Sequence, residues 1–402
     1  MFAGKNQGDM QIQNRSTVLR ILHAKGHLSR KELSRLSGLT PSTITNIIKD
    51  WQESGLVVEN GSAAGARGRN QVMLEINPDC RYVVGIQLAR DYIAGGLFNL
   101  NVDLLKSERI AITGENTMQE LLRKMKGMTW RLLGDEATTQ KTAAIGIGTP
   151  GPLSISEGKI TYASNFPGCR NIPIKQIFED EFNIRTVIEH DADTAALAEK
   201  LFGAGRNADN LIFVAAGAGV GAGVILNGEI YHGTSSTAGE IGHMTIDFQG
   251  PRCECGNYGC LELYCSSQAV CRQARKMLQT THRNSALSAC DTITPANIAT
   301  AVRTGDAAAI ALVTAAASQL GYGIVSIINL LHPDLVILGD EMSQCGEIWI
   351  DSVRKAAVSR LMPELAAQVK ISGASLRDPF LYGSGAVAIE SLFEDPNQFH
   401  LF

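Results

Sequence analysis

The chain lacks the features that would direct it to a membrane or out of the cell. No apolar run follows the first basic residue, so the N-terminus does not resemble a secretory signal peptide. No stretch offers the roughly 18 or more apolar residues of a membrane-spanning helix. We therefore expect a soluble, cytoplasmic protein with no membrane partner, and in that reducing compartment disulfides are disfavoured.

A strong overall charge is also missing, because the formal net charge is −4 over 402 residues. The distribution is uneven, since residues 1–70 hold ten basic and five acidic side chains, a net +5, which leaves −9 for the remainder. A basic head on an acidic body is typical of a small nucleic-acid-binding module fused to a larger part. The length suggests two to three domains.

Capping signals predict three helices in the basic head. The first covers 14–24, the second begins at the capping box Ser29–Glu32 and ends at Gly38, and the third covers Pro41–Glu53. Two short strands, 56–58 and 72–74, would form a wing. We expect a winged helix-turn-helix over residues 1–78; the alternative is a helical bundle that does not bind DNA.

The third helix would read operator DNA through its polar face. Polar residues near the start of such a helix lie where base edges are read in the major groove. The candidates share this face: Ser42, Thr43, Thr45, Asn46 and Lys49. Between the wing strands, Arg67 and Arg69 are separated by one glycine and could enter a narrow minor groove. The alternative for this pair is a solvated, charged loop.

A histidine and three cysteines have the spacing of a metal site. His243 precedes Cys253, Cys255 and Cys260, which can close a tetrahedral Cys3His zinc site. The alternatives are disulfides or a redox pair. No coordination position is left open, so we expect one structural zinc per chain. The six other cysteines are expected to be ordinary buried thiols: Cys80, Cys169, Cys265, Cys271, Cys290 and Cys345.

The segment GEIGHMTIDFQGPRCECGNYGCLE, residues 239–262, resembles the signature of the ROK family of repressors, open reading frames and kinases. The resemblance extends from about Tyr82 to the C-terminus and favours the branch of glucose and N-acetylglucosamine operon repressors. Strands alternating with helices indicate an α/β body. The resemblance implies two lobes of the actin-like ATPase (sugar kinase-like) type, residues 79–190 and 191–402, with the C-terminal helix returning to the first lobe.

The same resemblance implies a set of sugar-binding residues. Asp191 matches the catalytic base of the kinases, and four further residues match their sugar contacts: Asn165, Glu240, His243 and Glu262. Taken alone, Asp191 could be a helix N-cap and Asn165 a turn residue. His190 departs from the family pattern, because the kinases usually have asparagine before the base.

The nucleotide side departs further from the kinases. Where they have an Asp-x-Gly-Gly-Thr loop, this chain has Gln87, Arg90 and Asp91 at the acid, glycine and threonine positions. The second phosphate loop, 216–219, lacks the expected threonine, and Asp340 replaces a glycine. An arginine would obstruct such a loop and an aspartate would repel phosphate. We therefore expect no enzyme activity, with Asp191 a vestigial base.

Together these features predict a repressor of carbohydrate uptake or catabolism genes that is released by a sugar or sugar phosphate. A homodimer or a dimer of dimers is expected, because one recognition helix reads too few base pairs. Two alternatives remain: a bifunctional ATP-dependent sugar kinase with a DNA-binding head, and a repressor controlled by a partner protein.

Overall fold

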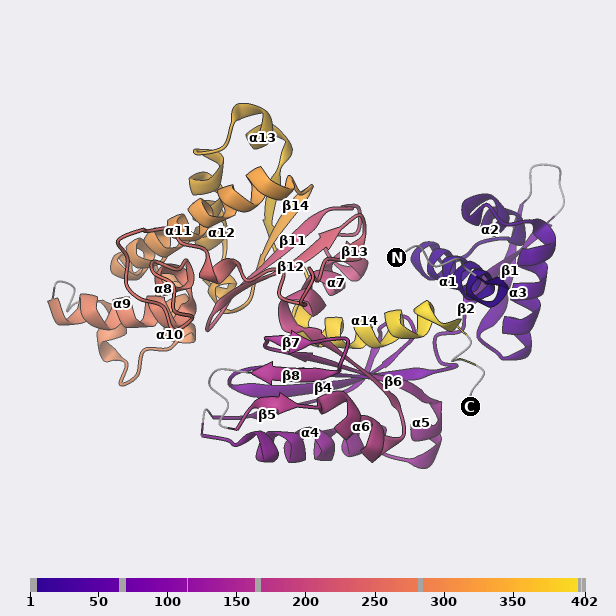
Figure 1. Ribbon diagram of the computed structural model, residues 1–402. Helices are drawn as coiled ribbons and strands as arrows, with labels where there is room; N and C mark the ends of the chain where they lie inside the picture. Colours follow the sequence, from indigo (N-terminus) through magenta and orange to yellow (C-terminus); the bar gives the residue numbers. More distant parts are fainter. Residues whose placement is uncertain are drawn as a thin grey trace. The chain divides into compact units, whose positions relative to one another are not determined.

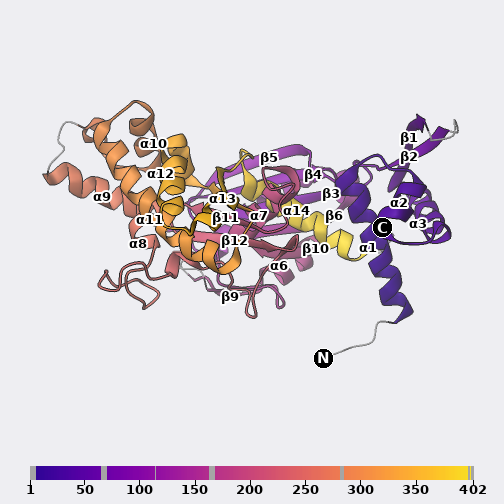
Figure 2. The ribbon, with the colours of Figure 1, turned by 90° about the horizontal axis from the view of Figure 1, so that it is seen from above.

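The chain folds into two compact units. The computed structural model describes residues 6–64, 70–113, 115–162, 168–280, 285–396 and 399. Unit 1 comprises Met1–Glu189 and Leu381–Phe402, and unit 2 comprises His190–Phe380. Figure 1 shows the elements of both units, and Figure 2 shows them turned by 90°.

The N-terminal part of unit 1 is a small helical head with a wing. It contains α1 (Gln7–Lys25), α2 (Arg30–Ser37), α3 (Pro41–Glu53) and the antiparallel strands β1 (Val57–Ala64) and β2 (Asn70–Ile76). The predicted caps at Ser29 and Thr40 are present, and Gly38 ends α2 with a φ of 71°. The first helix starts seven residues earlier than predicted, because Asn6 and Asp9 form another capping box.

The rest of unit 1 is built on a five-stranded sheet. Its strands lie in the order β10 (Arg185–His190), β6 (Thr142–Thr149), β3 (Tyr82–Leu88), β4 (Tyr92–Asn99) and β5 (Leu104–Ala111). The remaining elements are α4 (Met118–Leu133), α5 (Glu136–Lys141), β7 (Leu153–Ser154), β8 (Lys159–Tyr162), β9 (Arg170–Ile172), α6 (Ile174–Phe182) and α14 (Pro379–Glu394).

Two helices cover opposite faces of this sheet. Neighbouring residues of a strand point to opposite faces. A Cβ on Gly95 would lie 2.5 Å from Met128 Sδ of α4, whereas Gly85, on the other face, would meet Gly385 N of α14 at 2.6 Å. The absence of side chains at Gly85 and Gly385 therefore lets α14 lie directly on the strands, as Figure 1 shows.

Unit 2 contains a second five-stranded sheet. Its strands lie in the order β13 (Glu229–Ile230), β12 (Val220–Leu226), β11 (Leu211–Ala216), β14 (Leu335–Gly339) and β15 (Lys370–Gly373). The helices are α7 (Asp191–Phe202), α8 (Glu262–Cys265), α9 (Ser267–Thr280), α10 (Pro295–Arg303), α11 (Ala307–Leu331), α12 (Glu347–Val358) and α13 (Pro363–Gln368). Three 3-10 turns complete it: η1 (Ile241–His243), η2 (Ala286–Ala289) and η3 (Glu341–Cys345).

One helix of unit 2 differs from expectation. By length and composition α11 could cross a membrane, although no such run was predicted from the sequence. Leu320, Ile324 and Ile328 on this helix are fully buried in the largest core of unit 2. Packing within that core accounts for the apolar composition of α11.

The cysteines outside the predicted metal site agree with expectation in four of six cases. Cys169, Cys265, Cys271 and Cys345 are buried. Cys80 and Cys290 are only partly buried, which corrects the prediction for those two.

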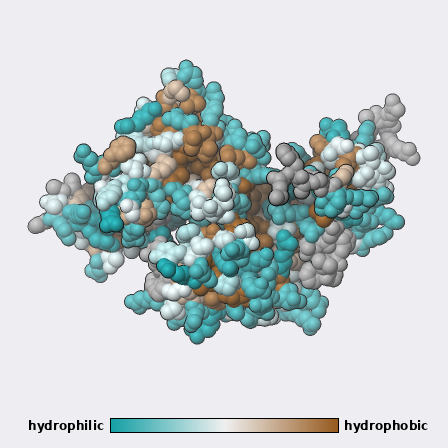
Figure 3. All heavy atoms as spheres, viewed as in Figure 1, coloured by the Kyte–Doolittle hydropathy of each residue, from teal (hydrophilic) through white to brown (hydrophobic). Residues whose placement is uncertain are grey.

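On the face of the molecule seen in Figure 3, hydrophobic residues are interrupted by hydrophilic ones.

Candidate functional site

The predicted metal-binding residues converge in unit 2. One ligand atom from each of His243, Cys253, Cys255 and Cys260 lies within 4.8 Å of the others. Cys255 Sγ and Cys260 Sγ are 3.7 Å apart, and Cys253 Sγ is 3.7 Å from His243 Nδ1. Disulfide sulfurs lie about 2.05 Å apart, so Cys255 and Cys260 are not bridged, and Cys253 is a free cysteine as well.

The cluster fits a tetrahedral ion. Zinc–sulfur bonds of about 2.3 Å give edges of roughly 3.8 Å between ligand sulfurs, close to the observed separation. Gly256 and Gly259 have φ angles of 95° and 63°, which lets the loop turn sharply around the sulfurs. Burial raises the pKa of the Cys253 thiol to about 12 in the absence of an ion, so a bound cation would be needed to favour its thiolate. The cluster could therefore hold a metal such as zinc.

Glycines also place the neighbouring carboxylate and imidazole of η1 against the sheet. A Cβ on Gly239 would lie 1.9 Å from Ala222 O, and one on Gly242 would lie 2.1 Å from Val220 O. The GEIGH segment can therefore lie directly on β12, which positions Glu240 and His243 beside it.

His243 links the metal cluster to two of the predicted sugar contacts. Its Nδ1 lies 3.5 Å from Glu262 Oε1, and its Nε2 lies 3.8 Å from Glu240 Oε2. Glu262 Oε1 is also 3.3 Å from Cys253 Sγ. One ring nitrogen thus faces the thiol cluster while the other faces Glu240.

Asp191 joins the same group of side chains through His190. Asp191 is the first residue of α7, and the preceding His190 occupies the N-cap position, so Asp191 is not the cap itself. His190 Nδ1 lies 3.3 Å from Asp191 Oδ1, and its Nε2 lies 3.7 Å from Glu240 Oε1. The structure thereby brings together Asp191, Glu240, His243 and Glu262, while Asn165 lies outside the described residues.

The His190 ring is electrostatically unusual. Burial by itself would lower its pKa, but the hydrogen bond to Asp191 and the charges of Asp191, Asp193 and Glu240 together raise the pKa to about 9. His190 is therefore positively charged at neutral pH. The sequence identified it only as a departure from the family pattern, and no local signal indicated its contact with Glu240.

The residues predicted to disfavour nucleotide binding lie in both units. In unit 1, Gln87 is buried in β3, and Arg90 and Asp91 lie in the turn before β4. In unit 2, Asp340 packs over residues 216–219, the predicted second phosphate loop, because a Cβ on Gly217 would lie 2.1 Å from Asp340 Oδ2. A carboxylate therefore lies directly over the backbone of this loop.

The predicted recognition helix, α3, presents the predicted polar residues to solvent. Along α3, Ile44, Ile47, Ile48 and Trp51 are buried. Ser42, Thr45, Asn46 and Lys49 are exposed and Thr43 is partly exposed. The hydroxyls of Ser42 and Thr43 lie 2.9 and 2.8 Å from Thr40 Oγ1, and Thr45 donates to Pro41 O.

Asn46 differs from these neighbours, because its amide has no hydrogen-bond partner among the residues that the structure describes. An uncommitted asparagine amide can bond an adenine edge through both of its polar atoms. The predicted minor-groove residues Arg67 and Arg69 lie outside the described residues.

Within unit 1, the head contacts the body through the end of α1. His23 Nε2 lies 2.9 Å from Leu100 O, and its ring meets the edge of Phe393 at a centroid distance of 5.0 Å. Arg20 forms an ion pair with Glu390 of α14. The head is therefore attached to α14 by contacts that sequence patterns did not reveal.

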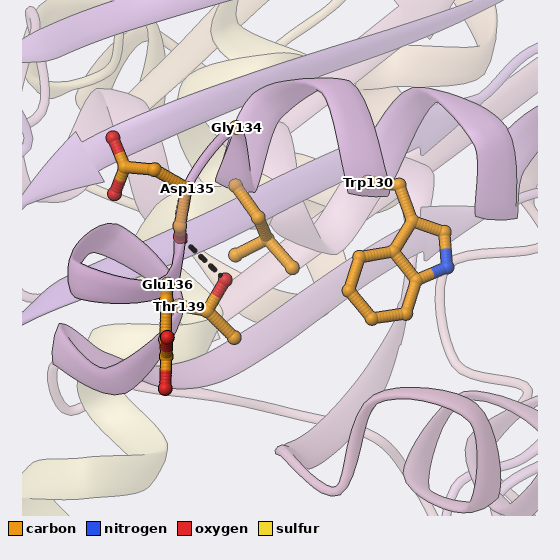
Figure 4. Close-up of a pocket in the computed structure, with 6 residues that line it drawn as sticks. Trp130, Gly134, Asp135, Glu136 and Thr139 are labelled. Carbon is orange, nitrogen blue, oxygen red and sulfur yellow. Dashed lines mark hydrogen bonds between the residues drawn. The ribbon is translucent and has the colours of Figure 1, made fainter.

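A separate pocket lies beside α4 and α5. Its lining residues are Trp130, Leu133, Gly134, Asp135, Glu136 and Thr139. Figure 4 shows Thr139 bonded back to Asp135, whose carboxylate in turn caps α5 through Thr138 N at 2.7 Å. These groups serve the helix end, and none of the predicted site residues lines this pocket.

Comparisons with known proteins match both parts of the chain. The ROK family description matches residues 83–389, and the description of winged helix-turn-helix DNA-binding domains matches residues 13–58. The xylose repressor of Caldicellulosiruptor bescii is 30% identical over 95% of this chain and 97% of its own length.

Two solved structures show the fold. A ROK family transcriptional regulator, homolog of the E. coli MLC protein, has a TM-score of 0.86 at 27% identity, covering 98% of each chain. A ROK glucokinase from Streptomyces griseus, in complex with glucose and AMPPNP, has a TM-score of 0.70 at 27% identity and covers 76% of this chain and 99% of its own. The regulator, unlike the kinase, spans nearly the whole chain.

These matches confirm the predicted family and fold class, a winged helix-turn-helix followed by an α/β, sugar kinase-like body. The family match extends over more than half of the chain, and a relative of 30% identity spans nearly all of it. The chain belongs to the ROK family.

Proposed function

We propose that the protein is a sugar-responsive, DNA-binding transcriptional repressor of carbohydrate uptake or catabolism genes. The observation that carries this proposal is the fusion of a winged helix-turn-helix to a ROK body in which Asp191, Glu240 and Glu262 gather with His243. Carboxylates accept hydrogen bonds from several hydroxyls at once, which suits a sugar. The name of the xylose repressor relative supports this class of function.

In this proposal the head binds operator DNA and the metal cluster holds one structural zinc. Ser42, Thr43, Thr45, Asn46 and Lys49 contact the major groove, and Arg67 and Arg69 the minor groove. His243, Cys253, Cys255 and Cys260 bind the ion, which supplies rigidity and orients His243 toward Glu240. The protein acts in the cytoplasm as a homodimer or a dimer of dimers, so that paired heads read paired half-sites.

The proposed domains are a DNA-binding domain over 1–78 and two lobes over 79–190 and 191–402. The return of the C-terminal helix is supported by the assignment of Leu381–Phe402 to unit 1.

The alternative of an ATP-dependent sugar kinase is less well supported. The carboxylate of Asp340 lies over Gly217, where a kinase of this family would present backbone N–H groups to phosphate. Arg90 and Asp91 change the charge and size of the first loop. These features favour a sensor without phosphoryl transfer.

A continuous route along the chain connects the sugar side with the head. In unit 2, the Thr194 hydroxyl donates to Asp191 O at 2.7 Å and lies 3.5 Å from Phe380 O at the start of α14. In unit 1, the other end of α14 carries Glu390 and Phe393, which contact α1. We infer that a shift of α7 on sugar binding moves α14 and changes the position of the head, provided the sugar binds the two states unequally.

Replacing Asp191 by alanine is expected to weaken sugar binding by about 1.5–3 kcal/mol, because a charged hydrogen-bond acceptor is lost. Operator binding should remain, since Asp191 belongs to unit 2 whereas the DNA-binding head belongs to unit 1. The measurement is fluorescence anisotropy of labelled operator DNA titrated with D-xylose, D-glucose and N-acetyl-D-glucosamine. Asp209→Ala is the control, because that side chain is 83% exposed in the same unit.

An assay of ATP consumption on the unmodified protein and on Asp191→Ala decides between a sugar sensor and a sugar kinase. We expect no sugar-dependent ATP consumption by the unmodified protein. Robust turnover that Asp191→Ala abolishes would replace the repressor by the bifunctional kinase. If a partner protein releases the operator and no sugar does, the alternative of a repressor controlled by a partner protein would be favoured.

The route through α14 predicts that His23→Ala retains operator binding but loses most of the sugar-dependent release. Arg20→Ala should have a smaller effect, because a partly exposed ion pair contributes at most about 1 kcal/mol. The same anisotropy titration measures both variants. The exposed Lys25→Ala is the control, and an unchanged response of His23→Ala would exclude this contact from the signal.

The contact of His23 with Leu100 and Phe393 should also depend on pH. Burial lowers the pKa of His23 below its usual 6.5, so the buried ring is neutral. A histidine whose pKa is lowered in the folded protein contributes to stability fully above pH 6.5. This contribution declines as the pH falls toward the pKa of the folded state. Acidification should therefore weaken the attachment of the head in the unmodified protein more than in His23→Ala.

A further inference from the structure

His190 lies between two of the predicted sugar-binding carboxylates, at a position where the kinases of the family usually have asparagine. It ends β10 and precedes α7, and its side chain is 18% exposed. Its two ring nitrogens face different carboxylates, with Nδ1 3.3 Å from Asp191 Oδ1 and Nε2 3.7 Å from Glu240 Oε1. A single ring therefore spans two of the residues that the sugar proposal assigns to the ligand.

His190 contacts one oxygen of each of these two carboxylates. Asp191 Oδ1 also accepts a hydrogen bond from Ala192 N at 2.7 Å, so this oxygen is committed to the protein. Glu240 turns Oε1 toward His190 and Oε2 toward His243 Nε2, 3.8 Å away. A series of alternating acidic and imidazole side chains thus runs from Asp191 through His190 and Glu240 to His243.

Such a series requires a positive charge at His190. Two carboxylates held near each other repel, and one of them would tend to bind a proton unless a cation lies between them. The charged groups facing His190 are Asp191 and Asp193 of α7 and Glu240 before η1, all of them acidic. A neutral asparagine, the residue usual in the kinases, could donate a hydrogen bond but could not balance this charge.

We propose that His190 is a specificity-determining residue of the candidate sugar site, which holds Asp191 and Glu240 in position and favours an uncharged, hydroxyl-rich ligand over a phosphorylated one. This inference rests on the proposed function of the site. Asp191, Glu240 and Glu262 provide three negative charges against the one positive charge of His190. A ligand phosphate would add like charge beside these carboxylates, which disfavours phosphorylated sugars.

The first test needs no ligand. Because the pKa of His190 is raised to about 9 in the folded protein, its stabilising contribution is complete below pH 6.5 and is lost as the pH rises through about 9. The melting temperature of the unmodified protein should exceed that of His190→Asn at pH 6.5, and the difference should shrink by pH 10. His332→Asn is the matched control, since His332 is exposed in the same unit and has a φ of 43° that asparagine tolerates.

The second test measures binding by calorimetry. D-Xylose, D-glucose and N-acetyl-D-glucosamine are compared with D-glucose 6-phosphate at pH 7 and pH 10. At least one of the uncharged sugars should bind the unmodified protein, and the phosphate should bind more weakly. His190→Asn should lose roughly ten- to hundredfold in affinity at pH 7, and much less at pH 10. His332→Asn should bind as the unmodified protein does.

The outcomes separate this inference from the proposed function. If an uncharged sugar binds but His190→Asn binds it equally at both pH values, the role of His190 is refuted and the sugar sensor stands. Tighter binding of glucose 6-phosphate overturns the ligand class. If no sugar binds, the sensor proposal and the ligand class fall together. If the difference in melting temperature between the unmodified protein and His190→Asn does not change with pH, the proposed role of a positively charged His190 between Asp191 and Glu240 is refuted, whatever the binding results.

Discussion

Replacing Cys255 by serine should prevent the binding of the proposed zinc ion and abolish the sugar response. Zinc in structural sites contributes about 10–16 kcal/mol to the folding of zinc-finger peptides, so its loss is the largest single effect expected in this chain. Here unit 2 keeps its own core, and we expect the damage to centre on residues 239–262. His243 would lose the ion opposite its Nδ1, and Glu240 and Glu262 would lose a fixed partner.

Metal analysis of the purified protein should find about one zinc per chain and almost none in Cys255→Ser. Operator binding should survive, because the head has a separate core around Ile44, Ile48 and Trp51. Cys290→Ser is the matched control, since Cys290 is a partly buried cysteine of unit 2 outside the cluster. Metal-free protein that still releases operator DNA on sugar addition would disprove the role of the ion.

Combined replacement of Thr43 and Asn46 by alanine should have the largest effect on DNA binding. Each lost base contact costs about 1–3 kcal/mol, so specific affinity should fall by at least tenfold and non-specific affinity should change little. The folded head should tolerate both changes. Thr43 keeps its backbone N–H bond to Thr40 Oγ1, and alanine is the stronger helix former at the exposed position 46.

Gel-shift titration on the operator and on a scrambled duplex measures both affinities. Lys49→Ala is the control for charge, because a lost phosphate contact should weaken both complexes alike and reduce the salt slope by about 1. Asn46→Ala should account for more of the loss than Thr43→Ala, since the Thr43 hydroxyl already lies 2.8 Å from Thr40 Oγ1. Equal specific binding by the double variant and the unmodified protein would exclude α3 as the reader.

Local chemistry made the starts of α2 and α3 predictable, whereas α1 and the wing strands β1 and β2 are longer than predicted. Ser29 and Thr40 bond the backbone three residues onward, so their helices begin where the sequence indicates. The start of α1 was missed because Asn6 and Asp9 precede a segment with few apolar residues. The strands β3, β6, β11 and β14 are short apolar runs, because each lies inside a sheet that is covered on both faces.

The metal cluster was equally predictable, since its ligands lie within 18 residues of one another, from His243 to Cys260. Short loops with glycine at 256 and 259 leave few ways to arrange them. The contact of His190 with Glu240 was not predictable, because 50 residues and several elements separate the two in sequence. Only the packing of η1 on β12, allowed by Gly239 and Gly242, brings Glu240 to it.

The sequence by itself determined the family, the winged head and the cluster of residues that could hold a metal, because each depends on residues that are near neighbours in the chain. Tertiary structure alone decided that Asp340 lies over Gly217, that His23 meets Phe393 and that His190 spans two carboxylates. These contacts join segments whose local patterns are independent of one another. Their geometry is set by close backbone packing, which no local pattern records.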